Sequence, residues 1–253
     1  ELDKGNRSFI KKESFKLDSK TMFLFDNNCM EGIEDQFLEM GKLETEILNQ
    51  AFPINIATEK EVGKVFHDQT NYDFIDDHRA KKLKLILNQL KKYADRKYEI
   101  NYEIYLIEDN SINAWTVMGG RIYFTTGMYD FAQNDDEIAN IIGHEIGHNE
   151  QKHTHKHIQR RAPILLFGEP AEFIIGIMEK GMVAFNQYQE IEADRSGFYL
   201  ANKAGYNPLV GLNFWQRLAE KEEKNILDKF FRSHPYSEDR YNCGINYLNE
   251  HKN

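Results

Sequence analysis

The sequence predicts an α+β protein that is mainly helical, and three observations support this expectation. Apolar residues recur at helical spacing over most of the chain, and helix caps and stop signals bound these stretches. Three short runs rich in β-branched and aromatic residues, at 102–107, 114–118 and 121–126, indicate a small sheet. With 253 residues and 41% hydrophobic content, the chain can bury a substantial core as one compact unit.

The N-terminal part of the chain is expected to contribute helices. A helical pattern runs through residues 31–49, and Pro53 ends it. The next helix is expected to begin with Thr58 as its N-cap, and Glu61, three residues later, completes a capping box. These helices would form a layer on the rest of the molecule.

A long helix is expected over residues 77–95, directly before the first predicted strand. Its lysines are interspersed with leucines, which could suit an anionic membrane surface. An ordinary helix with a solvated face explains the pattern better. We place a boundary ahead of this helix, so that residues 1–76 form a partly helical segment that packs on a domain formed by residues 77–253.

The segment that follows the strands predicts a long buried helix. Asn134 and Glu137 have the spacing of a capping box, which starts the helix. Four isoleucines then recur at helical spacing: Ile138, Ile141, Ile142 and Ile146. From this helix to the end of the chain the pattern again favours helices.

This helix carries a His-Glu-x-x-His motif formed by His144, Glu145 and His148. Residues four apart lie almost one above the other on a helix, so the two imidazoles face one point in space. Two histidines and a glutamate beside an apolar stripe are costly to bury unless a cation joins them. The motif therefore predicts a zinc site in which Glu145 takes a proton from water.

A catalytic zinc site usually has three protein ligands, so one more is needed. The third histidine of the metzincin pattern would fall at Thr154, and the glycine before it at Gln151, which excludes that class. Three nearby histidines are out of register, and we expect them to be solvated residues near a helix end: His153, His155 and His157.

The better candidate lies on a later helix whose small and apolar stripe ends at Gly205. Extending this stripe backward places Glu190 on the face that must pack, with Asp194 one turn further on. We expect Glu190 to bind zinc and Asp194 to accept the free ring N–H of a zinc-bound histidine, in preference to a structural ion pair. Glu192 is expected to lie on a solvated face.

These motifs together resemble the zinc metallopeptidase family that contains the type I CAAX prenyl endoprotease, HtpX and BepA. The resemblance rests on the His-Glu-x-x-His motif and on the Glu-x-Glu-Ala-Asp sequence of residues 190–194. Further similar segments are Asn113-Ala114-Trp115 with Gly119-Gly120, Ala204-Gly205-Tyr206-Asn207-Pro208, and Ser233-His234-Pro235 with Arg240. The resemblance covers roughly residues 81–247 and identifies residues 77–253 as a zinc metalloprotease domain.

The resemblance implies a gluzincin fold with a small sheet whose edge strand borders the active-site cleft. An extended substrate would add to the strand at 114–118, and an ordinary hairpin is an equal alternative. Its implied substrate-binding residues are Asn113, Ala114, Trp115 and Gly119. His234 would approach the metal, either to steady an oxyanion or to occupy the open position at rest, although a surface histidine competes with this role. The implied catalytic set is Glu145, His234 and Asp194.

The bulk properties limit the partners. The formal charge of −9 and the lack of a basic stripe argue against nucleic acid as a partner. The most apolar stretch, residues 164–185, is interrupted by charges and is not expected to span a membrane, while association with a membrane surface stays open. The start at Glu1 without methionine favours export after removal of a leader. The two cysteines, Cys29 and Cys243, permit one disulfide without requiring it. Oligomeric state is not readable from the sequence.

We therefore expect a zinc-dependent endopeptidase with one Zn²⁺ per chain that acts on protein or peptide substrates, with Glu145 as general base. A peptide deformylase would need a cysteine ligand, and neither cysteine has the required sequence setting. The remaining alternative is a binding, assembly or chaperone-like factor whose zinc site is structural or is kept latent by His234.

Overall fold

The computed structural model describes residues 14–18, 46–47, 49–51, 53–156, 158–159, 185–220, 234 and 238–252. Most of the helix expected over residues 31–49 lies outside this part of the chain, as does the apolar stretch 164–185 apart from Phe185. Among the described residues, none of the helices combines the length and the apolarity that a bilayer crossing requires.

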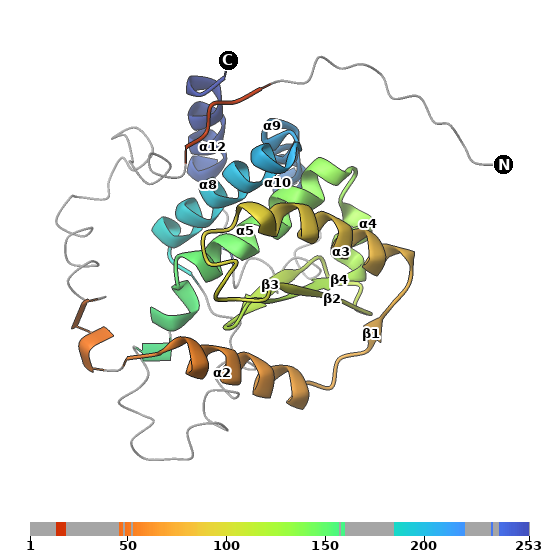
Figure 1. The fold of residues 1–253 in the computed structure, drawn as a ribbon. Coiled ribbons are helices and arrows are strands. Elements are labelled where there is room, and N and C mark those ends of the chain that lie inside the picture. The colour runs from red at the N-terminus through yellow and green to blue at the C-terminus, as the bar shows by residue number, and fades with distance from the viewer. Residues whose placement is uncertain are drawn as a thin grey trace.

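A four-stranded mixed sheet lies at the centre of the molecule (Figure 1). The strands are β1 (Phe74–Ile75), β2 (Glu103–Ile107), β3 (Ala114–Val117) and β4 (Arg121–Thr125), in the order β1-β2-β4-β3. The central pair β2 and β4 is parallel, and both outer pairs are antiparallel. The three predicted strands are therefore confirmed, and β3 is an edge strand of the described sheet. The two residues of β1 are too few to produce a readable pattern.

The turn between β3 and β4 requires its two glycines. Gly119 and Gly120 have φ of 78° and 82°, a left-handed conformation in which a Cβ would be strained. Helix α2 (Ile56–Gln69) approaches this turn so closely that a Cβ on Gly63 would lie 1.9 Å from the carbonyl oxygen of Met118. The turn and α2 are therefore packed backbone to backbone.

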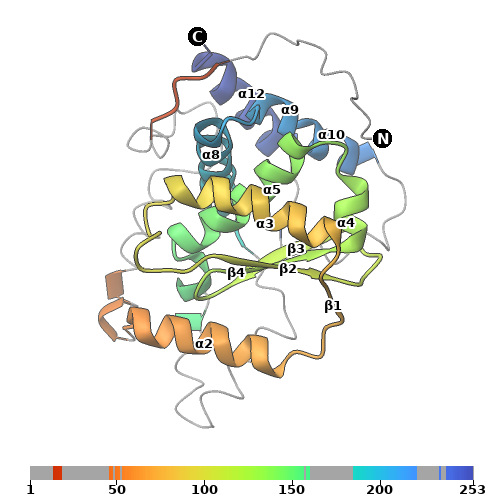
Figure 2. The ribbon, with the colours of Figure 1, turned by 45° about the vertical axis from the view of Figure 1, so that its right-hand side comes forward.

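Helix α2 covers one face of the sheet, and the other helices labelled in the pictures lie on the opposite side (Figures 1 and 2). The expected start of α2 was wrong by three residues. Asn55, not Thr58, is the N-cap, and its side chain accepts a hydrogen bond from the backbone N–H of Thr58 at 2.9 Å. Asn and Thr can both cap a helix, and Asn55 is the N-cap because it directly precedes the first helical turn.

Helices α3 (His78–Leu90) and α5 (Asp135–Glu150) pack on the other face of the sheet, and α8 (Gln187–Ala204) packs on α5. The helix expected over residues 77–95 ends earlier, at Leu90, and continues as a short 3-10 turn over Lys91–Tyr93. The start of α5 is as predicted, because Asn134 accepts a hydrogen bond from the backbone N–H of Glu137 at 3.0 Å.

The α5–α8 contact is very close because glycines form it. A Cβ on Gly143 would lie 2.9 Å from Cα of Gly197, and one on Gly147 would lie 2.7 Å from Cβ of Ser196. Small residues at these points let the two backbones touch, so side chains next to the contact converge. As predicted, α8 ends at Gly205, whose φ of 92° is left-handed.

Further helices complete this side of the molecule: α4 (Thr126–Phe131), α9 (Pro208–Gly211), α10 (Asn213–Glu220) and α12 (Glu238–Glu250). The segment 14–18 runs beside the end of α12 (Figure 2). An antiparallel bridge joins Phe15 of this segment to Lys252, just after the end of α12. The side chain of Asn202 in α8 donates a hydrogen bond to the carbonyl of Phe15. Phe15 and Leu17 are both buried there.

Candidate metal centre

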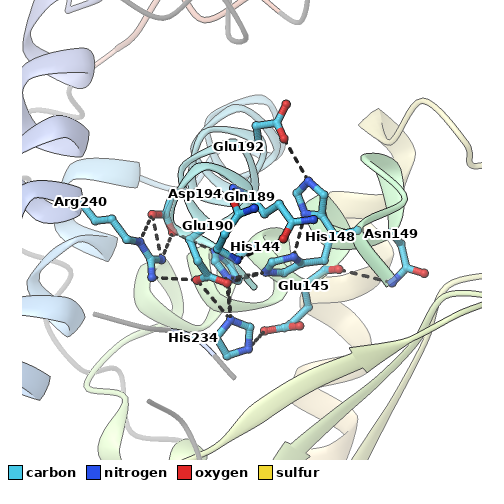
Figure 3. Close-up of polar contacts among 12 residues, drawn as sticks. His144, Glu145, His148, Asn149, Gln189, Glu190, Glu192, Asp194, His234 and Arg240 are labelled. Atoms are coloured by element: carbon cyan, nitrogen blue, oxygen red, sulfur yellow. Dashed lines mark hydrogen bonds and ion pairs between the residues drawn. The ribbon is translucent and has the colours of Figure 1, made fainter. Parts of the chain in front are cut away.

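Four side chains from three parts of the chain meet in one buried cluster (Figure 3). His144 and His148 come from α5, Glu190 comes from α8, and His234 precedes α12. One ligand atom from each of the four lies within 4.8 Å of all the others, and each residue is at most 3% exposed. The close α5–α8 contact brings the first three together, since both helices present their site residues next to the glycine interface.

Asp194 orients the first histidine. Its carboxylate accepts a hydrogen bond from Nδ1 of His144 at 2.8 Å, so the proton of a neutral His144 lies on Nδ1 and the lone pair lies on Nε2. This Nε2 atom lies 3.0 Å from Nε2 of His148 and 3.5 Å from an oxygen of Glu190. The ring is thus held with its lone pair directed into the cluster.

Arg240 contacts two carboxylates of α8 and holds Glu190 in its ionised form. Its guanidinium donates hydrogen bonds to Asp194 at 2.9 and 3.0 Å and lies 2.7 Å from an oxygen of Glu190. Burial alone would raise the pKa of Glu190, but the charges of Arg240 and His234 outweigh it and keep this pKa well below its usual range. Glu190 is therefore an anionic oxygen donor in a buried position.

The donor set fits a zinc ion. The Nε2 atoms of His144 and His148 lie 3.0 Å apart. The carboxylate oxygens of Glu190 lie 3.5 and 3.4 Å from these two nitrogens. Such acceptor groups repel at close range unless a cation lies among them. Two histidine nitrogens and one glutamate oxygen form a ligand set that zinc commonly has in hydrolases.

Glu145 lies beside the cluster as a buried carboxylate. Neither of its oxygens has a hydrogen-bond partner among the described residues, and its closest charged neighbour is Nε2 of His234 at 3.5 Å. Burial raises the pKa of Glu145 above its ordinary value, while His234 and His144 act in the opposite direction. A carboxyl group with a raised pKa suits a residue that must both take up and release a proton.

His234 is buried in the cluster, so the alternative of a surface histidine is wrong. Its Nδ1 atom lies 3.2 and 3.3 Å from the two oxygens of Glu190 and 3.2 Å from Nε2 of His144. Burial would lower the pKa of His234, but the carboxylates of Glu190 and Glu145 raise it above its ordinary value. The preceding and following sequence only indicated an extended position here; the side-chain contacts with α5 and α8 are a result of tertiary structure.

Two expectations about nearby residues were wrong. His153 and His155 are buried at 0% and 3% exposure, because the chain reverses at Lys152, whose φ of 55° is left-handed, and turns both side chains inward. Glu192 is also buried and lies 3.1 Å from Nε2 of His153. The segment after α5 covers the face of α8 that the helical pattern assigned to solvent. The third histidine of this group, His157, lies outside the described residues.

The predicted substrate strand is present, but its side chains point in two directions. Thr116 accepts a hydrogen bond from the side chain of Asn149 at the end of α5, so Ala114 and Thr116 face α5. Trp115 points to the opposite face, where its ring stacks on Tyr123 at 5.4 Å. Asn113 is buried, and its carbonyl accepts hydrogen bonds from Thr125.

Gly119 also lies away from the metal cluster, in the turn that packs against α2. A Cβ there would meet the backbone of Glu59 and Lys60 at 3.1 and 3.2 Å. Of the predicted substrate-binding group, only the backbone of β3 therefore has a position that an extended peptide could pair with.

Comparison with known proteins places the chain among metallopeptidases. The model described as Peptidase family M48 matches residues 77–243, more than half of the chain. The chain is 26% identical over 171 residues to a Beta-barrel assembly-enhancing protease of Yersinia pestis, and the match covers 60% of this chain and 35% of the relative. It is 28% identical over 152 residues to Mitochondrial metalloendopeptidase OMA1 of Arabidopsis thaliana, covering 56% of this chain and 30% of the relative. It is 28% identical over 174 residues to Metalloprotease LoiP of Escherichia coli K12, and the match covers 64% of this chain and 67% of the relative.

A helical body, a small sheet, and two histidines of one helix beside a glutamate of another define a gluzincin-type metallopeptidase. The chain belongs to peptidase family M48. The family resemblance inferred from the motifs is therefore confirmed. The chain spans about a third of the length of the first two relatives named above.

Proposed function

We propose that this protein is a zinc-dependent endopeptidase that hydrolyses peptide bonds in protein substrates. The observation that carries the proposal is the buried cluster of His144, His148 and Glu190 with the carboxylate of Glu145 beside it. In the proposed arrangement these three residues hold one zinc ion per chain. Bound at such a site, zinc supplies a Lewis acid that lowers the pKa of water and polarises a carbonyl group.

The residues around the site have separate tasks in this proposal. Glu145 takes a proton from water at one of its oxygens and passes it to the nitrogen of the leaving amine, which balances the proton over the reaction. Asp194 keeps the His144 ring in one orientation, and Arg240 binds Asp194 and keeps Glu190 ionised. Burial of the cluster excludes bulk water, which strengthens each of these electrostatic interactions.

Edge strand β3 is the proposed docking site for the substrate backbone. It pairs with β4 on one side only within the described sheet, and α5 packs against it. A peptide that extends the sheet at this edge would bind through main-chain hydrogen bonds, with little dependence on its sequence. Protein segments in extended conformation are thus the proposed substrate class.

A resting, latent state is the second candidate, and the position of His234 supports it. Its Nδ1 atom lies within hydrogen-bonding distance of both Glu190 and His144. A fourth protein ligand at zinc would fill the coordination position that a hydrolase needs for water. In that state the protein would bind its partners without cleaving them until His234 moves.

Cleavage of casein and of a quenched peptide by the wild type, Glu145→Gln and His234→Ala tests both candidates, with zinc content measured in each protein. The endopeptidase proposal expects Glu145→Gln to keep zinc and to lose cleavage by more than about 100-fold. Cleavage that appears only in His234→Ala would establish latency. Cleavage by Glu145→Gln at the wild-type rate, or no cleavage by any zinc-loaded variant, would contradict the proposed enzyme.

Export of the protein is a further proposal. Cys243 is buried and disulfide-bonded, and disulfides persist in oxidising compartments outside the cytoplasm. The chain's other cysteine, Cys29, lies outside the described residues. Titration of free thiols in the purified protein, before and after reduction, tests this proposal: thiols present before reduction would contradict it.

A further inference from the structure

His148, the second histidine of the motif, begins a chain of three buried polar side chains, and the proposed reaction does not use the other two. Nδ1 of His148 lies 2.9 Å from Nδ1 of His153, and Nε2 of His153 lies 3.1 Å from an oxygen of Glu192. His148 and His153 are 0% exposed, and Glu192 is 8% exposed. Figure 3 shows the run of contacts from Glu192 down to the metal cluster.

The hydrogen bonds in this chain have only one consistent direction when the two rings are neutral. An ionised carboxylate only accepts, so His153 donates from Nε2 to Glu192. The other nitrogen of a neutral His153, Nδ1, then carries a lone pair and accepts. His148 must therefore donate from Nδ1, which leaves the lone pair of its Nε2 atom directed at the metal cluster.

The fold holds these rings tightly. The chain reverses directly after α5 through Lys152, whose left-handed φ of 55° is unfavourable for a residue with a side chain, and this reversal places His153 over His148. The ring of Phe185 stacks on the face of the His148 ring with centroids 3.8 Å apart and an angle of 20°. The two contacts leave the imidazole of His148 little freedom to rotate.

We propose that His153 and Glu192 form a positioning relay that selects the metal-binding tautomer of His148 and fixes the direction of its Nε2 lone pair. The inference rests on the proposed zinc site and deepens it. His144 has a direct partner in Asp194, whereas His148 reaches its carboxylate through a second imidazole. Both carboxylates come from α8, so the helix that supplies Glu190 also orients both histidines.

A zinc-affinity series separates this relay from ordinary packing. Zinc dissociation constants are measured by competition with a chromophoric chelator for the full chain, without any substrate. His153→Phe fills the space but accepts no hydrogen bond, and we expect zinc to bind about 10- to 100-fold more weakly. His153→Asn places an amide oxygen near the position of Nδ1, where it can accept from His148, and should restore most of the lost affinity. Glu192→Gln should weaken binding less than His153→Phe, since an amide oxygen still accepts from His153.

Two exposed positions supply matched controls. His78→Phe repeats the histidine substitution and Glu61→Gln repeats the glutamate substitution at exposed residues, and both should leave the zinc dissociation constant within about twofold of the wild type. Equal affinity of His153→Phe and His153→Asn, whether both are weak or both match the wild type, would overturn the relay. Because this comparison measures binding alone, it stands even if the wild type cleaves no peptide.

The wild-type protein offers a test that does not depend on a variant folding. An N–H···N hydrogen bond between two imidazoles produces a scalar coupling between the two nitrogen nuclei across the bond. We expect such a coupling between Nδ1 of His148 and Nδ1 of His153 in the zinc-loaded, ¹⁵N-labelled protein, with the proton on His148. Assignment of that proton to Nδ1 of His153, or its rapid exchange with water, would overturn the proposal.

Discussion

At the scale of single residues, Arg240 is the main charge that keeps Glu190 ionised in the candidate site. It contacts both Asp194 and Glu190 from a position that is 4% exposed, and its guanidinium lies over the ring of Trp215 at 4.8 Å. Burial would otherwise raise the pKa of Glu190 and favour its protonated form, which binds a cation poorly. The motif histidines therefore depend on a residue that lies about 90 positions further along the chain.

The substitution Arg240→Met tests this dependence. It keeps an unbranched side chain of similar length but leaves Asp194 and Glu190 as buried charges without their cation, and we expect the metal-free protein to lose about 3–5 kcal/mol of stability. Added zinc should recover part of this loss, because the metal replaces one positive partner of Glu190. Urea unfolding with and without zinc measures both effects, and an unchanged free energy of unfolding in the metal-free state would contradict the assigned role.

At the scale of helices, the contact between α5 and α8 determines whether the two halves of the ligand set meet. Both helices use glycine where the backbones touch, at Gly143, Gly147 and Gly197. Helix α2 also contributes, because it packs on the β3–β4 turn and carries the buried carboxylate of Glu59. Arg96 binds this carboxylate and also donates to the carbonyl of Asn149, so α2 and α5 share one buried cation.

Gly143→Ala should push α5 and α8 apart. The new methyl group would lie 2.9 Å from the backbone of Gly197, where no side chain can move away, so we expect a loss of about 1–3 kcal/mol and weaker zinc binding. Gly244→Ala in α12 is the matched control, because its nearest neighbour is a ring atom of Phe198 at 3.1 Å. Thermal unfolding and the zinc dissociation constant are the measurements, and equal behaviour of the two variants would refute the explanation.

The buried pair of Glu59 and Arg96 predicts a defined pH dependence. Burial acts to raise the pKa of Glu59, but hydrogen bonds and charge from His155 and Arg96 outweigh it and lower this pKa from 4.5 to about 2. The folded state thus keeps the carboxylate ionised where the unfolded chain has already taken up a proton. Its stabilisation, about 3 kcal/mol, is complete above pH 4.5 and is lost as the pH falls toward 2.

Glu59→Gln should therefore be less stable than the wild type at pH 7, and the difference in the free energy of unfolding should shrink as the pH falls below 4.5. Urea unfolding of both proteins at several values between pH 7 and the lowest pH at which both remain folded measures the difference. A gap that stays constant over this range would show that Glu59 stabilises the fold by packing rather than by its charge.

At the scale of the whole molecule, the candidate metal centre connects segments that are far apart in the sequence. Its ligand atoms come from α5, from α8 and from the residue His234 ahead of α12, while the sheet lies between α5 and α2 (Figure 1). A bound ion would tie these segments together in the folded state only. Metal binding and folding are therefore expected to be coupled.

Removal of metal with a chelator should lower the unfolding temperature by about 10 °C, since a ligand at 1,000-fold its dissociation constant stabilises by about 4 kcal/mol. Zinc added back should restore it, and His144→Ala should show neither the loss nor the recovery. Calorimetry with parallel zinc analysis is the measurement. A wild-type unfolding temperature that is unaffected by chelation, with zinc shown to be gone, would mean that the site adds nothing to the fold.

The sequence by itself determined the elements and most members of the cluster. Helical spacing around the His-Glu-x-x-His motif, the cap at Asn134 and the stop at Gly205 are local signals, so strands and helices could be predicted within a few residues. The face of α8 that must pack pointed to Glu190 and Asp194 in the same way. The chain also belongs to the family that its motifs resemble.

Only the tertiary structure decided what surrounds these residues. His153 and Glu192 were expected in solvent because a helical pattern reports one buried face, whereas the chain reversal at Lys152 covers a second face of α8. His234 and Arg240 reach the cluster from a distant segment, and hydrophobic periodicity within one helix cannot predict a contact between distant segments. Local signals fix backbone shape through short-range contacts, but burial and long-range pairing depend on how the completed elements pack, which is why the relay behind His148 became visible only in the folded molecule.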